Sequence, residues 1–216
     1  MLYLAVIVST CGLACLLWYW LSVRYNRAKA VRVLRWIQAA LAGQGHVVGI
    51  RWLAPSQFRV SLRLASTVFQ RAWILVELAP RHKPLAWFHR RRQPETLIFQ
   101  ADLDLPPAFS LDVHRFRWFA RNGRKLPLDE VRWNFAKTVP CIITTRKDWQ
   151  KEIAGAMTSL SGGNSYGDYL DISFQRKSPH FSVTLPLEAI SPASPTRHYM
   201  LETMRELAAN SSASLS

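Results

Sequence analysis

The sequence predicts an α+β protein in which a single N-terminal transmembrane helix precedes a soluble domain with a largely antiparallel sheet and two or three helices. Three observations support this fold class. Residues 2–23 carry no charged side chain, several later segments alternate apolar and polar residues, and helical spacing recurs mainly after these segments. With 49% apolar residues and three cysteines, the chain of 216 residues has a globular composition and not a disordered or disulfide-stapled one.

The uncharged run from Leu2 to Val23 is long enough to cross a bilayer. At about 1.5 Å per residue it covers the hydrocarbon layer of about 30 Å. A cleaved signal peptide is disfavoured, because no Lys or Arg precedes the run and bulky aromatic residues stand where a cleavage site needs small ones. We expect residues 1–23 to form a transmembrane helix with an aromatic interface belt made of Trp18, Tyr19, Trp20 and Tyr25.

Basic residues follow the span directly. They are Arg24, Arg27, Lys29, Arg32 and Arg35, with no acidic residue among them. By the positive-inside rule we expect the N-terminus outside and the C-terminal domain in the cytoplasm, which suits a bacterial inner membrane. Residues 24–43 continue the helical pattern until Gly43 and Gly45, and their basic side is opposite an apolar stripe of Val33, Ile37, Ala40 and Leu41.

This juxtamembrane segment has two compatible interpretations. Its apolar stripe is typical of the first core helix of a domain, with the cations solvated. Its basic side is typical of a helix that contacts an anionic lipid surface, at about 1 kcal/mol for each charge near the headgroups. The charge of the whole chain supports the second interpretation, because residues 1–137 hold 21 basic and 7 acidic residues whereas residues 138–216 hold seven of each.

The soluble α+β domain is expected over residues 45–210. Residues 58–64 alternate without interruption and predict a half-buried strand, as do residues 96–103. Residues 71–78 predict a central strand and residues 47–52 a weaker one. Later segments predict a hairpin at 169–176 and 180–187, a second hairpin around Asn122-Gly123, helices over 146–160 and from Ser194-Pro195, and a disordered tail at 211–216.

The segment from Pro80 to Pro94 is too long for a tight turn and predicts a projecting loop. It combines Trp87 and Phe88 with Arg90, Arg91 and Arg92, the composition of an element that dips into a headgroup region. Two alternatives remain open. The aromatic residues could cap the core beneath solvated arginines, or the arginines could bind RNA or an acidic protein segment.

A second basic stretch, residues 114–125, interleaves cations with aromatic residues as single-strand nucleic-acid platforms do. Ordinary amphipathic strand alternation explains the same pattern. We find no catalytic motif, no zinc-ligand spacing and no phosphate-binding loop, so we expect neither a cofactor nor a metal nor an enzyme.

The sequence therefore favours a single-pass inner-membrane protein whose cytoplasmic domain works by binding. Its expected partners are the anionic leaflet of the lipid bilayer and a protein of unknown identity. A membrane-tethered protein that binds nucleic acid or another polyanion is the alternative, and an uncharacterised membrane-anchored enzyme is the third possibility.

Overall fold

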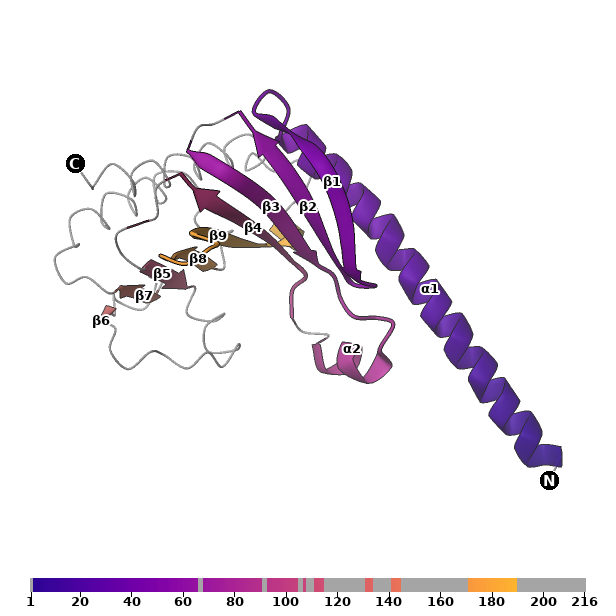
Figure 1. The fold of residues 1–216 in the computed structure, drawn as a ribbon. Helices are drawn as coiled ribbons and strands as arrows, with labels where there is room; N and C mark the ends of the chain where they lie inside the picture. Colours follow the sequence, from indigo (N-terminus) through magenta and orange to yellow (C-terminus); the bar gives the residue numbers. More distant parts are fainter. Residues whose placement is uncertain are drawn as a thin grey trace.

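The structure is a computed structural model that describes residues 2–65, 68–90, 93–104, 107, 111–114, 131–133, 141–144 and 171–189. The architecture is α+β, with a long N-terminal helix and an antiparallel sheet (Figure 1). The predicted turn at Asn122-Gly123, the helices at 146–160 and after Ser194, and the tail at 211–216 lie outside the described residues.

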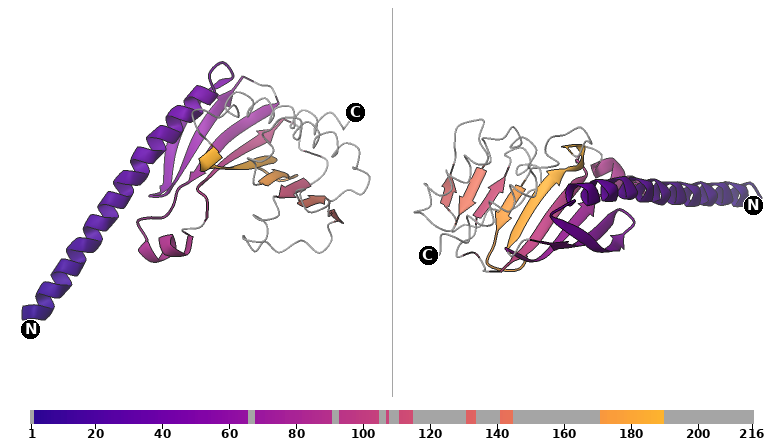
Figure 2. Two further views of the ribbon diagram at one scale, coloured as in Figure 1. Left: turned by 180° about the vertical axis from the view of Figure 1, so that it is seen from behind. Right: turned by 90° about the horizontal axis from the view of Figure 1, so that it is seen from above.

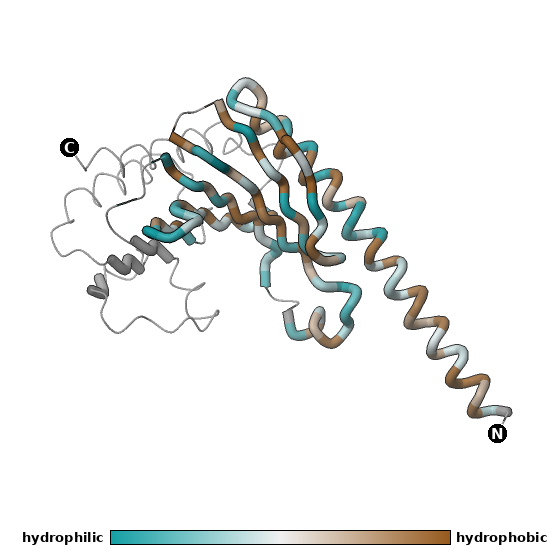
Figure 3. Tube along the Cα trace, in the orientation of Figure 1, coloured by the Kyte–Doolittle hydropathy of each residue, from teal (hydrophilic) through white to brown (hydrophobic). Residues whose placement is uncertain are grey.

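Helix α1 (Leu2–Ala40) is one continuous helix of 39 residues. No break separates the apolar span from the basic segment that follows it. The helix is long and apolar enough to cross a membrane, and the rest of the chain buries none of its most apolar 18-residue window. This free half extends away from the sheet (Figures 1 and 3). The chain then turns at Gly43, whose φ of 85° lies in the left-handed region that ends helices at low cost for glycine.

Within the described residues, nine strands form one sheet in the order β1-β2-β3-β4-β9-β8-β5-β7-β6, and every pair is antiparallel. The strands are β1 (Gly45–Ala54), β2 (Gln57–Leu64), β3 (Phe69–Glu77), β4 (Thr96–Leu103), β5 (Leu111–His114), β6 (Val131–Trp133), β7 (Cys141–Thr144), β8 (Asp171–Phe174) and β9 (Phe181–Pro186). A short 3₁₀ helix (Leu187–Ala189) follows β9.

The strands predicted from alternation and the hairpin at 169–187 are confirmed. Strand β3 has the predicted central position, between β2 and β4, but its burial alternates: Ala72, Ile74 and Val76 are buried, and Trp73 and Leu75 are only half-buried. Strands β5 and β6 were not expected, because each is too short to show a period.

The upper half of α1 covers one face of the sheet, as the views from behind and above show (Figure 2). Its buried apolar residues are Ala30, Val33 and Ile37, and Leu41 follows directly after the helix. They pack in one core with the inward side chains of the strands: Phe58, Val60, Leu62, Ile74, Val76, Leu97, Phe99, Phe181 and Val183. The juxtamembrane segment is therefore the first core helix of the domain, as the first interpretation of its apolar stripe predicted.

The start of β1 tolerates no side chain larger than that of glycine. A Cβ on Gly45 would lie 2.5 Å from the carbonyl oxygen of Arg63 and 3.0 Å from the Cα of Leu64, both backbone atoms of the paired strand. Gly49, on the same strand, has nothing within 4 Å of the corresponding position. Only one of these two glycines is required by a close approach of two backbones.

We therefore expect Gly45→Ala to destabilise the full-length protein by more than about 1 kcal/mol, because the β1–β2 backbones must separate to admit the methyl group. Thermal unfolding in a mild detergent, followed by tryptophan fluorescence, measures the effect. Gly49→Ala is the matched control and should leave the midpoint close to that of the parent. Equal midpoints for the two variants would contradict the close approach at Gly45.

Candidate membrane-contact site

Two buried polar residues on α1 mark the point where the helix meets the domain. Ser22 and Asn26 are buried one turn apart, and Asn26 has no exposed surface at all. The Asn26 amide nitrogen donates to the carbonyl oxygens of Pro55 and Ala79, both at 3.3 Å, and its amide oxygen accepts from the Arg81 guanidinium at 3.3 Å. The side chain thus ties α1 to two loops of the sheet.

Glu95 closes this junction from the side of β4. Its carboxylate pairs with Lys29 of α1, accepts from Arg81 at 3.0 Å, and accepts from the backbone amide of Ala79 at 3.2 Å. Burial opposes ionisation, but the hydrogen bonds and the two nearby cations outweigh it, so the pKa of Glu95 lies below its ordinary value. Glu95 is therefore ionised at neutral pH.

Arg81 joins the junction to the aromatic belt. Its carbonyl oxygen accepts a hydrogen bond from Nε1 of Trp18 at 2.9 Å and another from Oγ of Ser22 at 3.2 Å. Its guanidinium lies 4.5 Å from the centre of the Tyr25 ring. The loop before α2 is thereby held at the level of residues 18–26 of the helix.

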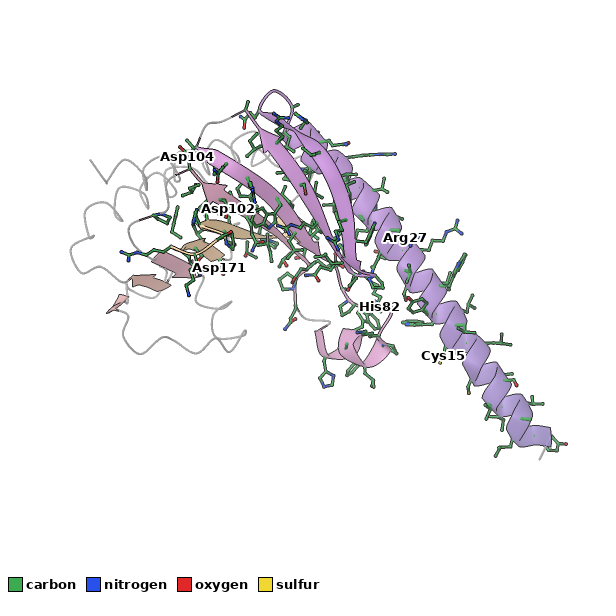
Figure 4. The ribbon with its side chains drawn as sticks, in the orientation of Figure 1. Cys15, Arg27, His82, Asp102, Asp104 and Asp171 are labelled. Carbon is green, nitrogen blue, oxygen red and sulfur yellow. The ribbon has the colours of Figure 1, made fainter. Side chains whose placement is uncertain are left out.

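The segment predicted as a projecting loop is structured differently. Residues Pro84–Arg90 form a short helix, α2, which packs back toward α1. The rings of Trp87 and Trp18 are 6.1 Å apart, and the His82 ring meets that of Tyr19 edge-on at 6.2 Å. Figure 4 shows His82 in the segment between the sheet and α2. The segment does extend beyond the sheet (Figure 1), but the helix in it was not predicted, nor were the aromatic partners on α1, which lie 63 to 69 positions earlier in the chain.

The surroundings of His82 favour its uncharged form. Burial lowers its pKa from the ordinary value, and the charge of Lys83 lowers it further. A neutral imidazole suits a position against the Tyr19 ring near the apolar part of α1.

Beside this aromatic contact, α2 leaves two large apolar side chains uncovered. Leu85 is 83% exposed and Phe88 is 70% exposed. Trp87 of the same turn is partly buried against α1. The exposed pair lies at the same level of α1 as the uncovered aromatic residues Trp18, Tyr19 and Trp20, so apolar surface from two distant segments lies side by side.

The predicted basic residues divide into two groups. Arg24, Arg27, Arg32 and Arg35 are exposed, and Arg24 lies 5.2 Å from the centre of the Trp20 ring. Lys29 instead turns toward the domain and pairs with Glu95. Of the three arginines after Phe88, Arg90 ends α2, whereas Arg91 and Arg92 lie outside the described residues.

Sequence reasoning missed Ser22, Asn26, Arg81 and Glu95. Two signals for them were present. Ser22 and Asn26 are spaced by one helical turn at the edge of the apolar run, and Glu95 is only the second acidic residue of a strongly basic chain. Neither signal names the partner, because the contacts with α1 join residues that are 29 to 66 positions apart.

No protein-family model matches the chain, and a search of curated proteins finds no match either. Among the described residues, no group of three His, Cys, Asp or Glu side chains could hold a metal ion. Asp102, the first residue of an Asp-Leu-Asp sequence, accepts a hydrogen bond from the Ser178 hydroxyl at 2.6 Å. The candidate site thus consists of the junction, the belt and α2.

The lowered pKa of Glu95 has a defined effect on stability. Because the folded pKa lies below the unfolded one, the ionised carboxylate stabilises the fold above the unfolded pKa, and this contribution is lost as the pH falls through the folded pKa. We expect Glu95→Gln to lower the unfolding midpoint at pH 7 and to flatten its decline below about pH 4.5. Thermal unfolding in an uncharged detergent measures both.

The matched control for this prediction is Glu77→Gln. Glu77 is exposed and accepts one hydrogen bond, from Gln57 at 2.9 Å, so its replacement should leave the unfolding midpoint and its pH profile close to those of the parent. A Glu95→Gln protein as stable at pH 7 as the Glu77→Gln protein would show that the junction contributes nothing to the fold.

Proposed function

We propose that this chain is a single-pass inner-membrane protein whose cytoplasmic domain is held against the lipid surface and works there by binding. The observation that carries the proposal is the position of α2, which packs beside Trp18 of α1 with Leu85 and Phe88 exposed. An uncovered apolar helix beside an apolar anchor is the arrangement of a second contact with the membrane interface.

The depth of α2 supports this proposal. Trp18 precedes Arg24, the first charged residue of α1, by six residues, which is about 9 Å along the helix. A side chain packed on Trp18 therefore lies on the membrane side of the first charge. Interfacial helices sit about 5–10 Å into the boundary between headgroups and acyl chains, so α2 has the depth at which Leu85 and Phe88 contact lipid.

The junction gives this contact a mechanical consequence. Asn26 and Glu95 tie α1 to the loops around Arg81 at the same level as the aromatic belt. A domain joined to its anchor in this way cannot rotate freely on a linker. Anchor and α2 together hold the sheet in one orientation above the bilayer, which suits a scaffold or accessory subunit that presents a fixed surface to a partner.

The charge of the chain supports the proposed orientation. The exposed Arg24, Arg27, Arg32 and Arg35 follow the span, and cations close to a membrane-crossing helix favour the cytoplasmic side. On that side they face anionic lipids, each charge near the surface contributing about 1 kcal/mol.

The depth of α2 is tested with a nitroxide label in the full-length protein. Phe88→Cys is labelled in a background in which Cys11, Cys15 and Cys141 are alanine, and the protein is placed in nanodiscs that contain anionic lipid. We expect the label to be relaxed strongly by oxygen and weakly by a water-soluble nickel chelate, because oxygen concentrates in acyl chains. Power-saturation electron paramagnetic resonance measures both.

The matched control label is Ser61→Cys, on the exposed surface of strand β2. We expect the nickel chelate to relax it strongly. A label at position 88 as accessible to the chelate as the label at position 61 would show that α2 lies in water and would remove the proposed second contact.

Topology is tested separately. A reporter fused after Ser216 that is active only in the cytoplasm should be active, because cations flank the domain end of the span. Replacing Arg24, Arg27, Arg32 and Arg35 with glutamine should reduce this activity, whereas Lys29 is retained because it pairs with Glu95. Activity of a reporter that works only in the periplasm, fused at the same position, would overturn the proposed orientation.

A polyanion-binding role is the second candidate, and one observation favours it. In the part of the chain that the structure describes, the sheet face opposite α1 carries exposed Arg51, Arg63 and Arg71. Arg59 on the same face stacks on Trp73, with its guanidinium 4.3 Å from the ring centre, so this tryptophan does not offer a free face to a base. The basic stretch 114–125 lies almost wholly outside the described residues. An enzymatic role is the third candidate.

A further inference from the structure

Strand β1 is the edge of the sheet nearest the anchor, and its outer side is unpaired in the described part of the chain. It stands at one end of the strand order and pairs only with β2. Its ten residues include no proline and leave Val48, Ile50, Trp52 and Leu53 more than 40% exposed. Unpaired backbone amides and carbonyls next to exposed apolar side chains form a template to which another strand can add.

Ile50 and Trp52 lie on the core face of the sheet, whereas Val48 and Leu53 stand at the two register shifts of the β1–β2 pairing. Ile50 is opposite Val60 and Trp52 is opposite Phe58, both of which are buried beneath α1. The Trp52 ring lies 5.1 Å from that of Phe58. A strand added beside β1 would extend this apolar layer and cover Ile50 and Trp52.

The direction of β1 excludes a second copy of this chain as the added antiparallel strand. β1 begins beside Leu41, whose carbonyl oxygen accepts from the Gly45 amide at 3.1 Å, and it ends before Pro55, whose carbonyl oxygen accepts from Asn26. The strand therefore runs back along α1 toward the membrane end, as its arrow in Figure 1 shows. Two copies in one bilayer with the same topology have parallel β1 strands.

Parallel pairing of two copies fails for a different reason. A two-fold axis along the bilayer normal would bring the two β1 edges together with opposite faces of the two sheets aligned. The apolar layer of one copy, with Ile50 and Trp52, would then continue into the arginine face of the other. Two copies of this chain therefore do not pair through this edge.

The charges on the sheet indicate what kind of segment would pair with β1. On the face opposite the core, Arg51 of β1 is directly opposite Arg59 of β2, and His46 is opposite Arg63. Arg51 and Arg59 carry like charges and repel across the two strands, and the acidic Glu77 of this face lies on β3 opposite Gln57, beyond β2 from Arg51. An acidic side chain on an added strand would lie next to Arg51 and offset this repulsion.

We propose that β1 accepts, as an added antiparallel strand, an extended segment of another protein in which acidic side chains alternate with apolar ones. The apolar side chains lie beside Ile50 and Trp52, and the acidic ones lie beside Arg51. Antiparallel to β1, the segment runs away from the bilayer. This inference rests on the proposed membrane anchoring, because the anchoring is what excludes a second copy. It adds to the proposed function the chemistry of the protein partner.

The test uses the full-length protein in nanodiscs of zwitterionic lipid, so that no anionic lipid competes. The probe is a fluorescent ten-residue peptide of alternating glutamate and valine with ¹³C-labelled carbonyl groups. We expect it to bind, as measured by fluorescence anisotropy, and to acquire the infrared band of an antiparallel strand on binding. A peptide of the same composition with its glutamates in one block should bind at least tenfold more weakly.

Arg51→Glu should weaken binding of the alternating peptide about tenfold or more and should allow a lysine–valine peptide to bind instead. Arg71→Glu is the control for total charge, because Arg71 is exposed on β3, two strands from the edge; since the new carboxylate would lie opposite Asp102, its unfolding midpoint is measured beside its binding. It should change neither affinity more than about twofold, since separated exposed charges are screened in salt.

Three outcomes overturn the proposal: no binding of the alternating peptide, equal losses for Arg51→Glu and Arg71→Glu, or binding without the strand signature. Equal losses together with tight binding of a single-stranded oligonucleotide would identify the arginine face as a polyanion site instead. The Phe88 label reports membrane contact independently. A buried label with no peptide binding would retain the proposed anchoring and remove only the added strand.

Discussion

The structure depends on the buried polar contact between α1 and the loops at the lower end of the sheet. Asn26 has no exposed surface, and leaving its amide unpaired there would cost about 1–3 kcal/mol. Its partners are backbone carbonyls of two different loops and the side chain of Arg81. Because Glu95 holds Arg81 and Lys29 at the same time, a slide of the helix by one turn would break the whole set together. The contact therefore sets the register of the anchor against the sheet.

This register divides α1 into an exposed apolar half and a half that packs on the sheet. Below the contact, the side chains of α1 are exposed along a length suited to lipid. Above it, Ala30, Val33 and Ile37 cover the apolar face of the sheet, which an antiparallel sheet must bury on at least one side. Helix α1 is thus also a core element of the domain. A protein shortened from the N-terminus would keep the apolar face of its sheet covered only if residues 24–41 were retained.

The same register determines what lies beside the apolar half of α1. It brings α2 to the level of Trp18, where Leu85 and Phe88 are uncovered, and it directs β1 back along α1. The proposed membrane contact and the sheet edge are consequently held at a constant height and orientation relative to α1. A flexible linker of the same length would hold neither, because each added degree of freedom lowers the fraction of time spent in any one pose.

Local patterns in the sequence determined the elements, and only the tertiary structure decided their partners. Alternation from Phe58 to Leu64 predicts a strand and its buried face from sequence alone, since a strand reverses its side chains at every residue. The uncharged run predicts the span because lipid excludes charge. No local pattern joins Trp18 to Trp87 or Lys29 to Glu95. Each of these residues is equally compatible with a solvated surface, and only long-range packing brings the two halves of each pair together.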